Sequence, residues 1–246
     1  MGYSYQLFCS RNFGPLPATL AMLSEAGFTE CEGYGGLFGD IPALKAALAE
    51  TGMSMTTAHI AVGDLERDPE GFVALAKELN MRAVFGPWMA PDERPTDAEG
   101  WRAFGARLAK AGKPFTAAGI PFGWHNHDFE LVDLEGGLLP LDCILEEESL
   151  CLELDLGWVT RAGKDPLEML ERYKGRIEAV HIKDIAPEGE KADEDGWADL
   201  GTGVVDYATI VPAARAAGID HFVLEHDNPS DDKRFASASL AALKTL

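Results

Sequence analysis

The chain has 246 residues, of which 46% are hydrophobic and 25% are charged, the composition of a globular protein that can bury a large core. Its net charge of −20 at pH 7 argues against a nucleic-acid partner and against an anionic membrane surface, because both kinds of binding need a basic face. No apolar run approaches the roughly 20 residues that span a bilayer. The N-terminus lacks a signal peptide's basic and apolar segments, and the four cysteines form no CxxC pair. These features predict a cytoplasmic protein with reduced thiols.

Strand-like apolar runs recur about every 30 residues, the length of one βα unit. The eight predicted strands are Tyr3–Cys9, Thr29–Gly33, Ser54–Ile60, Ala83–Trp88, Phe122–Asn126, Leu150–Leu154, Ala179–Ile182 and His221–Glu225. Helical stretches separate them, which predicts a parallel sheet with helices outside. Eight such units favour a single (β/α)8 TIM barrel over residues 1–246. The alternative is a doubly wound sheet, which needs a glycine-rich phosphate loop after its first strand. The residues at that place, Phe8–Gly14, do not match the GxGxxG pattern of such a loop.

Polar residues just before helical runs predict where the helices begin. Three aspartates are candidate N-caps: Asp40, Asp68 and Asp165. The last two precede prolines, which favour the first helical position. Thr96 with Glu99 matches the capping-box spacing, and Pro114 inside a helical pattern should kink or break that helix.

One long segment, Ala186–Gly203, is rich in acids and glycine and follows the seventh predicted strand. A loop of this length inside a compact domain is usually functional or mobile. A lid over the strand ends and a solvated acidic loop are both open interpretations.

Side chains of the metal-ligating kind stand at four strand ends: His125, Asp155, His181 and Glu225. In a barrel the C-terminal strand ends carry the site, so these four are expected to form one metal site. Imidazole nitrogen and carboxylate oxygen suit transition metals better than Ca²⁺. We therefore expect one divalent ion (Mn, Co, Zn, Fe, Ni or Mg) acting as a Lewis acid on a substrate's adjacent oxygens.

Other polar residues near these strand ends are candidates to move protons or to contact a substrate. Glu130 and Lys183 can move protons, and Lys183 shares a strand face with His181. Lys183 can hold a substrate oxygen or phosphate, or only pair with Glu153 or Glu225. The candidate substrate contacts are His59, His127, Trp88, Trp124 and Trp158. For the tryptophans, packing at the barrel end is the alternative to an apolar wall against a sugar.

Four motifs together resemble a known family. They are Gly123–Leu131, which contains His-Asn-His-Asp-Phe-Glu, then Leu154–Trp158, Val180–Asp184 and Leu200–Asp206. They resemble the xylose-isomerase-like TIM-barrel superfamily, and most closely its sugar phosphate isomerase/epimerase branch, over nearly the whole chain. The resemblance implies an enzyme, since that branch includes isomerases, epimerases and dehydratases of sugars, inositols and keto-sugars. A homodimer is compatible with it, because relatives often pair.

The resemblance also implies a ligand set of Glu, Asp, His and Glu. Asp155, His181 and Glu225 match the last three, whereas the first position falls on or next to His125. In the family's epimerases the first and last glutamates serve as ligands and as opposed acid/base groups. The departure at His125 therefore puts a two-glutamate epimerisation in doubt.

The second base would then be Glu130, His127 or His59, unless only one base is needed. Trp158 stands where several relatives have a histidine, so a multi-metal cluster is not expected. The superfamily's DNA-repair endonucleases need such a cluster and a basic face, which disfavours that activity here.

The expected function is a divalent-metal-dependent isomerase or epimerase of a sugar, keto-sugar or related polyol, acting through an enediolate. Glu225 or Glu130 removes the α-proton, and Lys183 or a histidine returns a proton or helps expel hydroxide. Expulsion would make the protein a dehydratase, which is the first alternative. The second is a non-catalytic sugar-binding barrel, suggested by the missing first glutamate. A metal-dependent hydrolase fits the ligands but lacks an evident acid for the leaving group.

Overall fold

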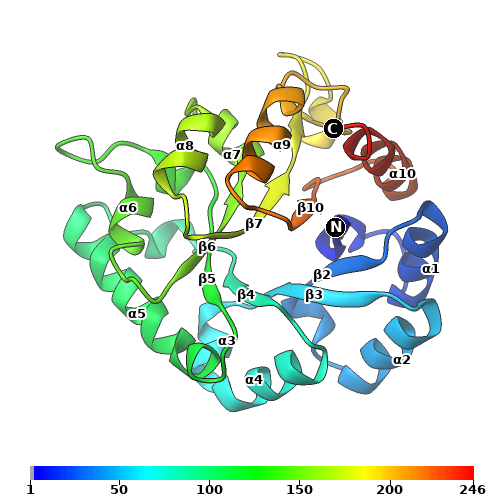
Figure 1. The fold of residues 1–246 in the computed structure, drawn as a ribbon, viewed down its shortest axis with the longest axis horizontal. Helices are drawn as coiled ribbons and strands as arrows, with labels where there is room; N and C mark the ends of the chain where they lie inside the picture. The colour runs from blue at the N-terminus through cyan, green and yellow to red at the C-terminus, as the bar shows by residue number, and fades with distance from the viewer. Residues whose placement is uncertain (1–2) are drawn as a thin grey trace. The chain divides into compact units, whose positions relative to one another are not determined.

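Eight parallel strands form a closed barrel in the computed structural model, which describes residues 3–246 (Figure 1). In barrel order the strands run β1-β10-β7-β6-β5-β4-β3-β2. Their bounds are β1 Tyr3–Gln6, β2 Glu30–Tyr34, β3 Ser54–His59, β4 Ala83–Gly86, β5 Phe122–His125, β6 Cys151–Asp155, β7 Ile177–Ile182 and β10 Phe222–Leu224. The predicted (β/α)8 TIM barrel is confirmed.

The α-helices follow the strands along the chain. They are α1 Leu16–Ala26, α2 Ile41–Thr51, α3 Val62–Arg67, α4 Pro69–Glu78, α5 Ala98–Ala117, α6 Pro140–Ile144, α7 Leu156–Arg161, α8 Pro166–Arg172, α9 Tyr207–Ala216 and α10 Asp232–Leu243. Short 3-10 turns are η1 Leu7–Ser10, η2 Gly35–Leu37, η3 Pro91–Glu93, η4 Phe129–Leu131 and η5 Ala192–Glu194. Within the described residues 3–246, no helix is long and apolar enough to cross a membrane.

Internal contacts divide the chain into two compact units. Unit 1 contains the residues up to Thr56 together with Ala179–Leu246, and unit 2 contains Thr57–Glu178. The boundaries fall inside β3 and β7. A single domain over residues 1–246 stays a prediction.

In unit 1, β1 pairs in parallel with β2 and β10, and β10 pairs with β7. This register sets Gln6 opposite Glu32 and His181 opposite Val223. Helices α1, α2 and α10 lie outside these strands (Figure 1). Buried aromatic rings seal the interior, since Tyr5 packs at 5.7 Å against Phe235 of α10.

In unit 2, β3, β4, β5 and β6 pair in parallel in that order. The register sets His125 opposite Glu153. Gly123 permits the close approach of these strands, because a Cβ there would overlap the carbonyl oxygen of Cys151. Helices α3, α4 and α5 lie outside β3, β4 and β5 (Figure 1).

The three aspartate N-caps are confirmed. Asp40 accepts from the Ala43 amide, Asp68 from the Gly71 amide and Asp165 from the Leu167 amide. The Thr96 capping box is wrong: Asp97 caps α5 through the Gly100 amide.

Nor does Pro114 break α5, which continues to Ala117. Pro114 stands in the last turn, so only three helical residues follow it.

The segment Ala186–Gly203 is packed rather than only solvated. Two short strands, β8 Asp184–Ile185 and β9 Trp197–Ala198, form a two-stranded antiparallel sheet. The Asp184 carboxylate accepts from the amides of Ile185, Gly201, Gly203 and Val205. Glu194, also buried, accepts from the Ser230 amide and hydroxyl and from Arg234.

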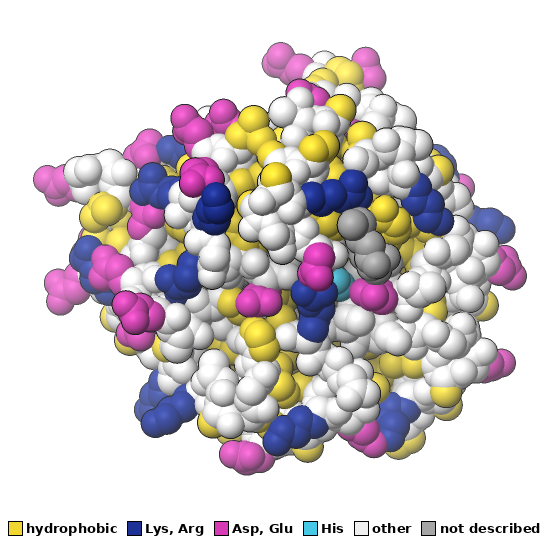
Figure 2. Space-filling view, viewed as in Figure 1, with side chains coloured by type: hydrophobic (Ala, Val, Ile, Leu, Met, Phe, Trp, Pro, Cys, Tyr) yellow, Lys and Arg dark blue, Asp and Glu magenta, His cyan; other side chains and the backbone are white. Residues whose placement is uncertain are grey.

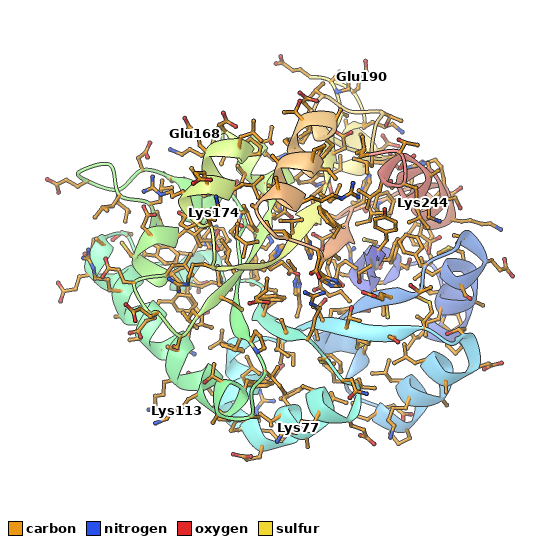
Figure 3. All side chains as sticks on the ribbon, viewed as in Figure 1. Lys77, Lys113, Glu168, Lys174, Glu190 and Lys244 are labelled. Carbon is orange, nitrogen blue, oxygen red and sulfur yellow. The ribbon has the colours of Figure 1, made fainter. Side chains whose placement is uncertain are left out.

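Charged side chains are mixed on the surface. On the face shown in Figure 2, Lys and Arg side chains are scattered among Asp and Glu instead of forming one stripe. The labelled Lys77, Lys113 and Glu168 stand on the outer helices α4, α5 and α8 and point outward (Figure 3).

Candidate active site

The C-terminal ends of β3, β5 and β6 bring four buried side chains together in unit 2. We call His59, His125, Glu153 and Asp155 the His125 group. His59 Nε2 lies 2.5 Å from Glu153 Oε2, and His125 Nδ1 lies 3.2 Å from the same oxygen. His125 Nε2 lies 3.9 Å from Asp155 Oδ2. Glu153 thus lies against one nitrogen of His125, and the other nitrogen is the one nearer Asp155, an arrangement compatible with a carboxylate behind a metal-bound imidazole.

Backbone and amide groups hold Asp155 in place. Asp155 ends β6 and is the N-cap of α7, where its Oδ1 accepts from the Trp158 amide at 2.7 Å. Its own N–H donates to Asn126 Oδ1 at 3.0 Å. Asn126 follows β5, so this bond ties the end of β5 to the end of β6 and fixes His125 relative to Asp155.

Glu130 is fully buried beside this group. Its Oε1 accepts from the Trp124 indole at 2.6 Å, and its Oε2 accepts from the His127 amide at 2.9 Å. Burial raises the pKa of Glu130 to about 8, although these hydrogen bonds pull the other way. Glu130 shapes the turn after β5, and its predicted role as a base stays a prediction.

Trp124 has no exposed surface, and it packs edge-on against Phe104. Its predicted contact with substrate stays a prediction.

His127 is half-buried among other rings. The His127 ring lies 5.1 Å from the His125 ring and 5.3 Å from the Trp158 ring. Trp88 is 51% exposed, with the Arg94 guanidinium 5.9 Å from its ring. The same guanidinium lies 3.6 Å from the ring of Phe129, which stacks on His127. The predicted contacts of His127, Trp158 and Trp88 with a substrate stay predictions.

The ends of β2, β7 and β10 form a second cluster, in unit 1. We call Glu32, His181, Lys183, Glu225 and Asp227 the His181 group. His181 Nε2 lies 2.7 Å from Glu32 Oε1, and His181 Nδ1 lies 2.9 Å from Glu225 Oε2.

Gln6 Nε2 also donates to Glu32, at 2.7 Å. If Nε2 of His181 donates to Glu32 while Nδ1 is unprotonated, the Nδ1 lone pair faces the Glu225 carboxylate at 2.9 Å, which is unfavourable. A proton on Nδ1 would turn this contact into a hydrogen bond, and a bound divalent ion would accept the Nδ1 lone pair instead.

Lys183 is buried against the same carboxylate. Its Nζ lies 2.7 Å from Glu225 Oε2 and 2.8 Å from Asp227 Oδ1. The ammonium also lies 4.9 Å from the centre of the Trp197 ring. Of the partners predicted for Lys183, Glu225 is confirmed. One carboxylate therefore contacts both a titratable imidazole and a titratable amine.

Two polar residues near the strand ends, His226 and Asp184, hydrogen-bond to the protein backbone. His226 is buried, its amide donates to Cys9 Sγ, and its Nδ1 accepts from the Asn228 amide. Burial lowers the pKa of His226 to about 4, so its ring is neutral at pH 7. Asp184 is committed to four backbone amides, as described above.

Both groups supply donors of the kind a transition metal prefers. His59, His125 and Glu153 each offer a ligand atom within 4.8 Å of the others. The 3.9 Å between His125 Nε2 and Asp155 Oδ2 is a separation that two atoms about 2.1 Å from one ion can span. The residues present therefore fit a divalent ion.

The sequence profile described as Xylose isomerase-like TIM barrel matches residues 20–246. The chain belongs to the xylose isomerase-like TIM-barrel family. An inosose dehydratase from Geobacillus kaustophilus is 28% identical over 189 residues, which cover 68% of this chain and 61% of that protein. An inosose dehydratase from Lacticaseibacillus casei is 26% identical over 149 residues, covering 54% and 49%. The chain thus spans less than two thirds of the length of these relatives.

Solved structures of this TIM-barrel family share the fold. A sugar phosphate isomerase/epimerase from Parabacteroides distasonis superposes with a TM-score of 0.82 at 20% identity, covering 99% of this chain and 93% of that one. The 3-keto-D-glucoside 4-epimerase YcjR from E. coli superposes with a TM-score of 0.73 at 20% identity, and all of both chains is covered. The named relatives of this xylose isomerase-like chain are enzymes, namely dehydratases, epimerases and isomerases.

Sequence analysis missed three residues that position these groups: Gln6, Glu32 and Asn126. Glu32 carried a signal, because a carboxylate inside a strand expected to be buried needs a partner. Asn126 stood inside the His-Asn-His-Asp-Phe-Glu motif, but no role was assigned to it. Gln6 carried no signal, since a neutral amide at a strand end is as common in turns as in sites.

Proposed function

We propose that the chain is a divalent-metal-dependent isomerase or epimerase of a sugar, keto-sugar or related polyol. The observation that carries the proposal is the buried contact of one carboxylate, Glu225, with both His181 and Lys183. Membership of the family supports it, because the relatives named above act on such compounds.

We propose that His125, Asp155, His181 and Glu225 hold the ion. Family membership and the shared direction of barrel strand ends support this set. A bound divalent ion would supply Lewis acidity to the carbonyl and the neighbouring hydroxyl of the substrate, which makes the α-proton more acidic.

The chain's own residues then carry the proton chemistry. Glu225 accepts the α-proton of the bound ketose, giving an enediolate. Lys183, 2.7 Å from Glu225 Oε2, is placed to exchange a proton with it and to return one to the substrate. His127 and Trp158 supply the wall against the sugar, and His59 holds Glu153 behind His125.

A dehydratase is the second candidate, and the similarity to inosose dehydratases favours it. The same enediolate leads to either product. If the Lys183 ammonium protonates a β-hydroxyl, water leaves. If a proton returns to carbon, the product is an isomer or epimer.

The metal content of the purified protein is the first test. We expect about one equivalent of a transition metal in the wild type, by elemental analysis, and its loss in Asp155→Ala and in His181→Ala. Asp133→Ala is the control, because Asp133 is an exposed carboxylate that pairs with Lys164. A wild type that takes up no metal after reconstitution contradicts the Lewis-acid mechanism and favours the non-catalytic barrel.

The reaction itself is tested in D₂O with keto-sugars and an inosose. Deuterium uptake without loss of water identifies an isomerase or epimerase. Loss of water identifies the dehydratase, and it is measured through the ultraviolet absorbance of the conjugated product. Deuterium uptake without metal would contradict the proposed role of the ion.

A further inference from the structure

The turn after β1 presents an arginine at the edge of the His181 group. Arg11 is half-buried, and its Nη1 donates to two backbone carbonyls, that of Phe8 at 2.9 Å and that of Asp227 at 2.7 Å. Its guanidinium carbon lies 3.9 Å from the centre of the Phe8 ring. Phe8 in turn packs edge-on against Tyr34, with 5.4 Å between the ring centres. Two carbonyls therefore hold Nη1 of the guanidinium, and the Phe8 ring packs against its flat face.

This turn is rigidly tied to the His181 group. Gln6 accepts from the Phe8 amide at 3.0 Å and donates to Glu32, which contacts His181. At the other end of the turn, the hydroxyls of Tyr5 and Ser10 are 2.9 Å apart. Gln6 thus connects the turn that carries Arg11 to the Glu32 carboxylate that contacts His181.

Arg11 has no carboxylate partner within residues 3–246. Other arginines of this acidic chain pair with carboxylates, as Arg107 does with Glu66 and Arg172 with Asp142. The carboxylate of Asp227 contacts Lys183, and only its backbone carbonyl faces Arg11. The edge formed by Nε and Nη2 is therefore open, and this edge matches the two oxygens of a phosphate or carboxylate.

We propose that Arg11 is a specificity-determining residue that binds an anionic group, phosphate or carboxylate, on the substrate. Asp227 links the two ends of this arrangement, since it contacts Lys183 through its side chain and Arg11 through its backbone. A substrate held by Arg11 at its anionic end thus presents its other end toward Lys183 and Glu225. The inference rests on the proposed function for the reacting end, but binding alone measures the preference for charge.

The test is calorimetric binding, with Mn²⁺ present, of three probes: neutral D-ribulose, D-ribulose 5-phosphate, and the carboxylate 5-keto-D-gluconate. The wild type is expected to bind one anionic probe about 10- to 100-fold more tightly than D-ribulose, the range for hydrogen bonds between charged groups. The anion that it prefers identifies the group. Arg11→Gln should remove that preference and leave the dissociation constant for D-ribulose within about twofold.

Two further variants keep the result interpretable. Arg67→Gln is the matched control, because this substitution removes the same charge at an exposed arginine. Arg67 pairs only with its near neighbour Asp64. It should bind as the wild type does. Arg11→Lys keeps the charge but not the fork, so its preference should fall at least about threefold even if Arg11→Gln fails to fold.

Equal binding of all three probes by the wild type overturns the proposal, and so does an unchanged preference in both Arg11 variants. Deuterium exchange into a neutral ketose tests the proposed function without Arg11. If exchange occurs but no anion is preferred, only the Arg11 inference fails. If an anion is preferred but no exchange or dehydration occurs, the reaction is wrong and the binding site stands.

Discussion

The His125 group and the His181 group use similar side chains in different electrostatic settings. In unit 2, Glu153 contacts the imidazoles of His59 and His125, whereas one oxygen of Asp155 accepts from the fixed Trp158 amide. The nearby Glu130 likewise accepts from fixed donors, the Trp124 indole and the His127 amide. In unit 1, Glu225 is satisfied by His181 and Lys183, which can both gain or lose a proton. A carboxylate with fixed donors is suited to hold an ion, and one with titratable partners is suited to move protons. The contrast predicts which substitutions damage the chemistry and which damage binding.

The largest effect is expected at Glu225. Glu225→Gln keeps the shape but removes the charge that His181 and Lys183 share, so the deuterium-exchange rate should fall about 10²–10⁴-fold. The rate is measured at saturating metal by nuclear magnetic resonance. Glu153→Gln in the His125 group should lose much less at the same metal concentration. Equal losses in the two variants would remove the distinction between the groups.

A smaller effect, on metal affinity, is expected at Asn126. Asn126→Ala removes the acceptor of the Asp155 amide, so metal affinity should fall about 10- to 100-fold while the rate at saturating metal changes little. Competition with a fluorescent chelator measures the affinity. Asn228→Ala, which loses only a contact to a backbone carbonyl, is the control. An unchanged affinity in Asn126→Ala would show that Asp155 needs no such support.

The pH dependence of stability should have opposite signs at two buried glutamates. Because burial raises the pKa of Glu130 to about 8, its contribution is complete at low pH and is lost as pH rises from about 4.5 to about 8. The slope is on the order of 1 kcal/mol per pH unit. Burial alone would also raise the pKa of Glu194, but hydrogen bonds from Ser230 and Arg234 lower it overall. Its contribution is therefore present above pH about 4.5 and is lost as the pH falls.

Denaturant unfolding between pH 3.5 and 8 checks both signs. Relative to wild type, Glu130→Gln should gain stability from pH 5 to 8. Glu194→Gln should lose most above pH 5 and approach wild type near pH 3.5. Parallel profiles for wild type and Glu130→Gln would contradict the raised pKa.

The smallest effect is expected for pairs of exposed charges. Arg102 and Glu146 form an exposed pair at 2.8 Å, so breaking it should leave the unfolding free energy nearly unchanged. A double-mutant cycle with Arg102→Ala and Glu146→Ala measures the coupling. A coupling clearly larger than the error of the measurement would contradict this expectation.

All eight barrel strands were predictable, because each is a buried apolar run between helical stretches. Their ends were less so. The first strand was expected to reach Cys9 but ends at Gln6, whose side chain accepts from the Phe8 amide and starts a 3-10 turn. No apolar pattern reveals that local bond. The short β8–β9 sheet was missed for a different reason, since Asp184 pairs with Ala198 and its carboxylate binds the amides of Gly201, Gly203 and Val205, which are far from it in the sequence.

The candidate site was predictable in its residue types and less so in its contacts. His125, Asp155, His181 and Glu225 stood out because metal-ligating side chains followed buried strands. Arg11 did not stand out, because its importance lies in the absence of a carboxylate partner, and only the folded chain shows that. Lys183 was open between substrate and partner, and its contact with Glu225 required the register of β7 and β10.

The two buried carboxylates that fix the segment after β7 also make it useful for protein engineering. Asp184 holds one end and Glu194 the other, while Glu188–Glu190 between them are exposed, with Glu190 pointing outward in Figure 3. Inserted residues at this tip would replace no buried contact, so they should leave the fold unchanged. The tip is therefore a place to attach a fluorophore or a purification tag, or to graft a longer loop.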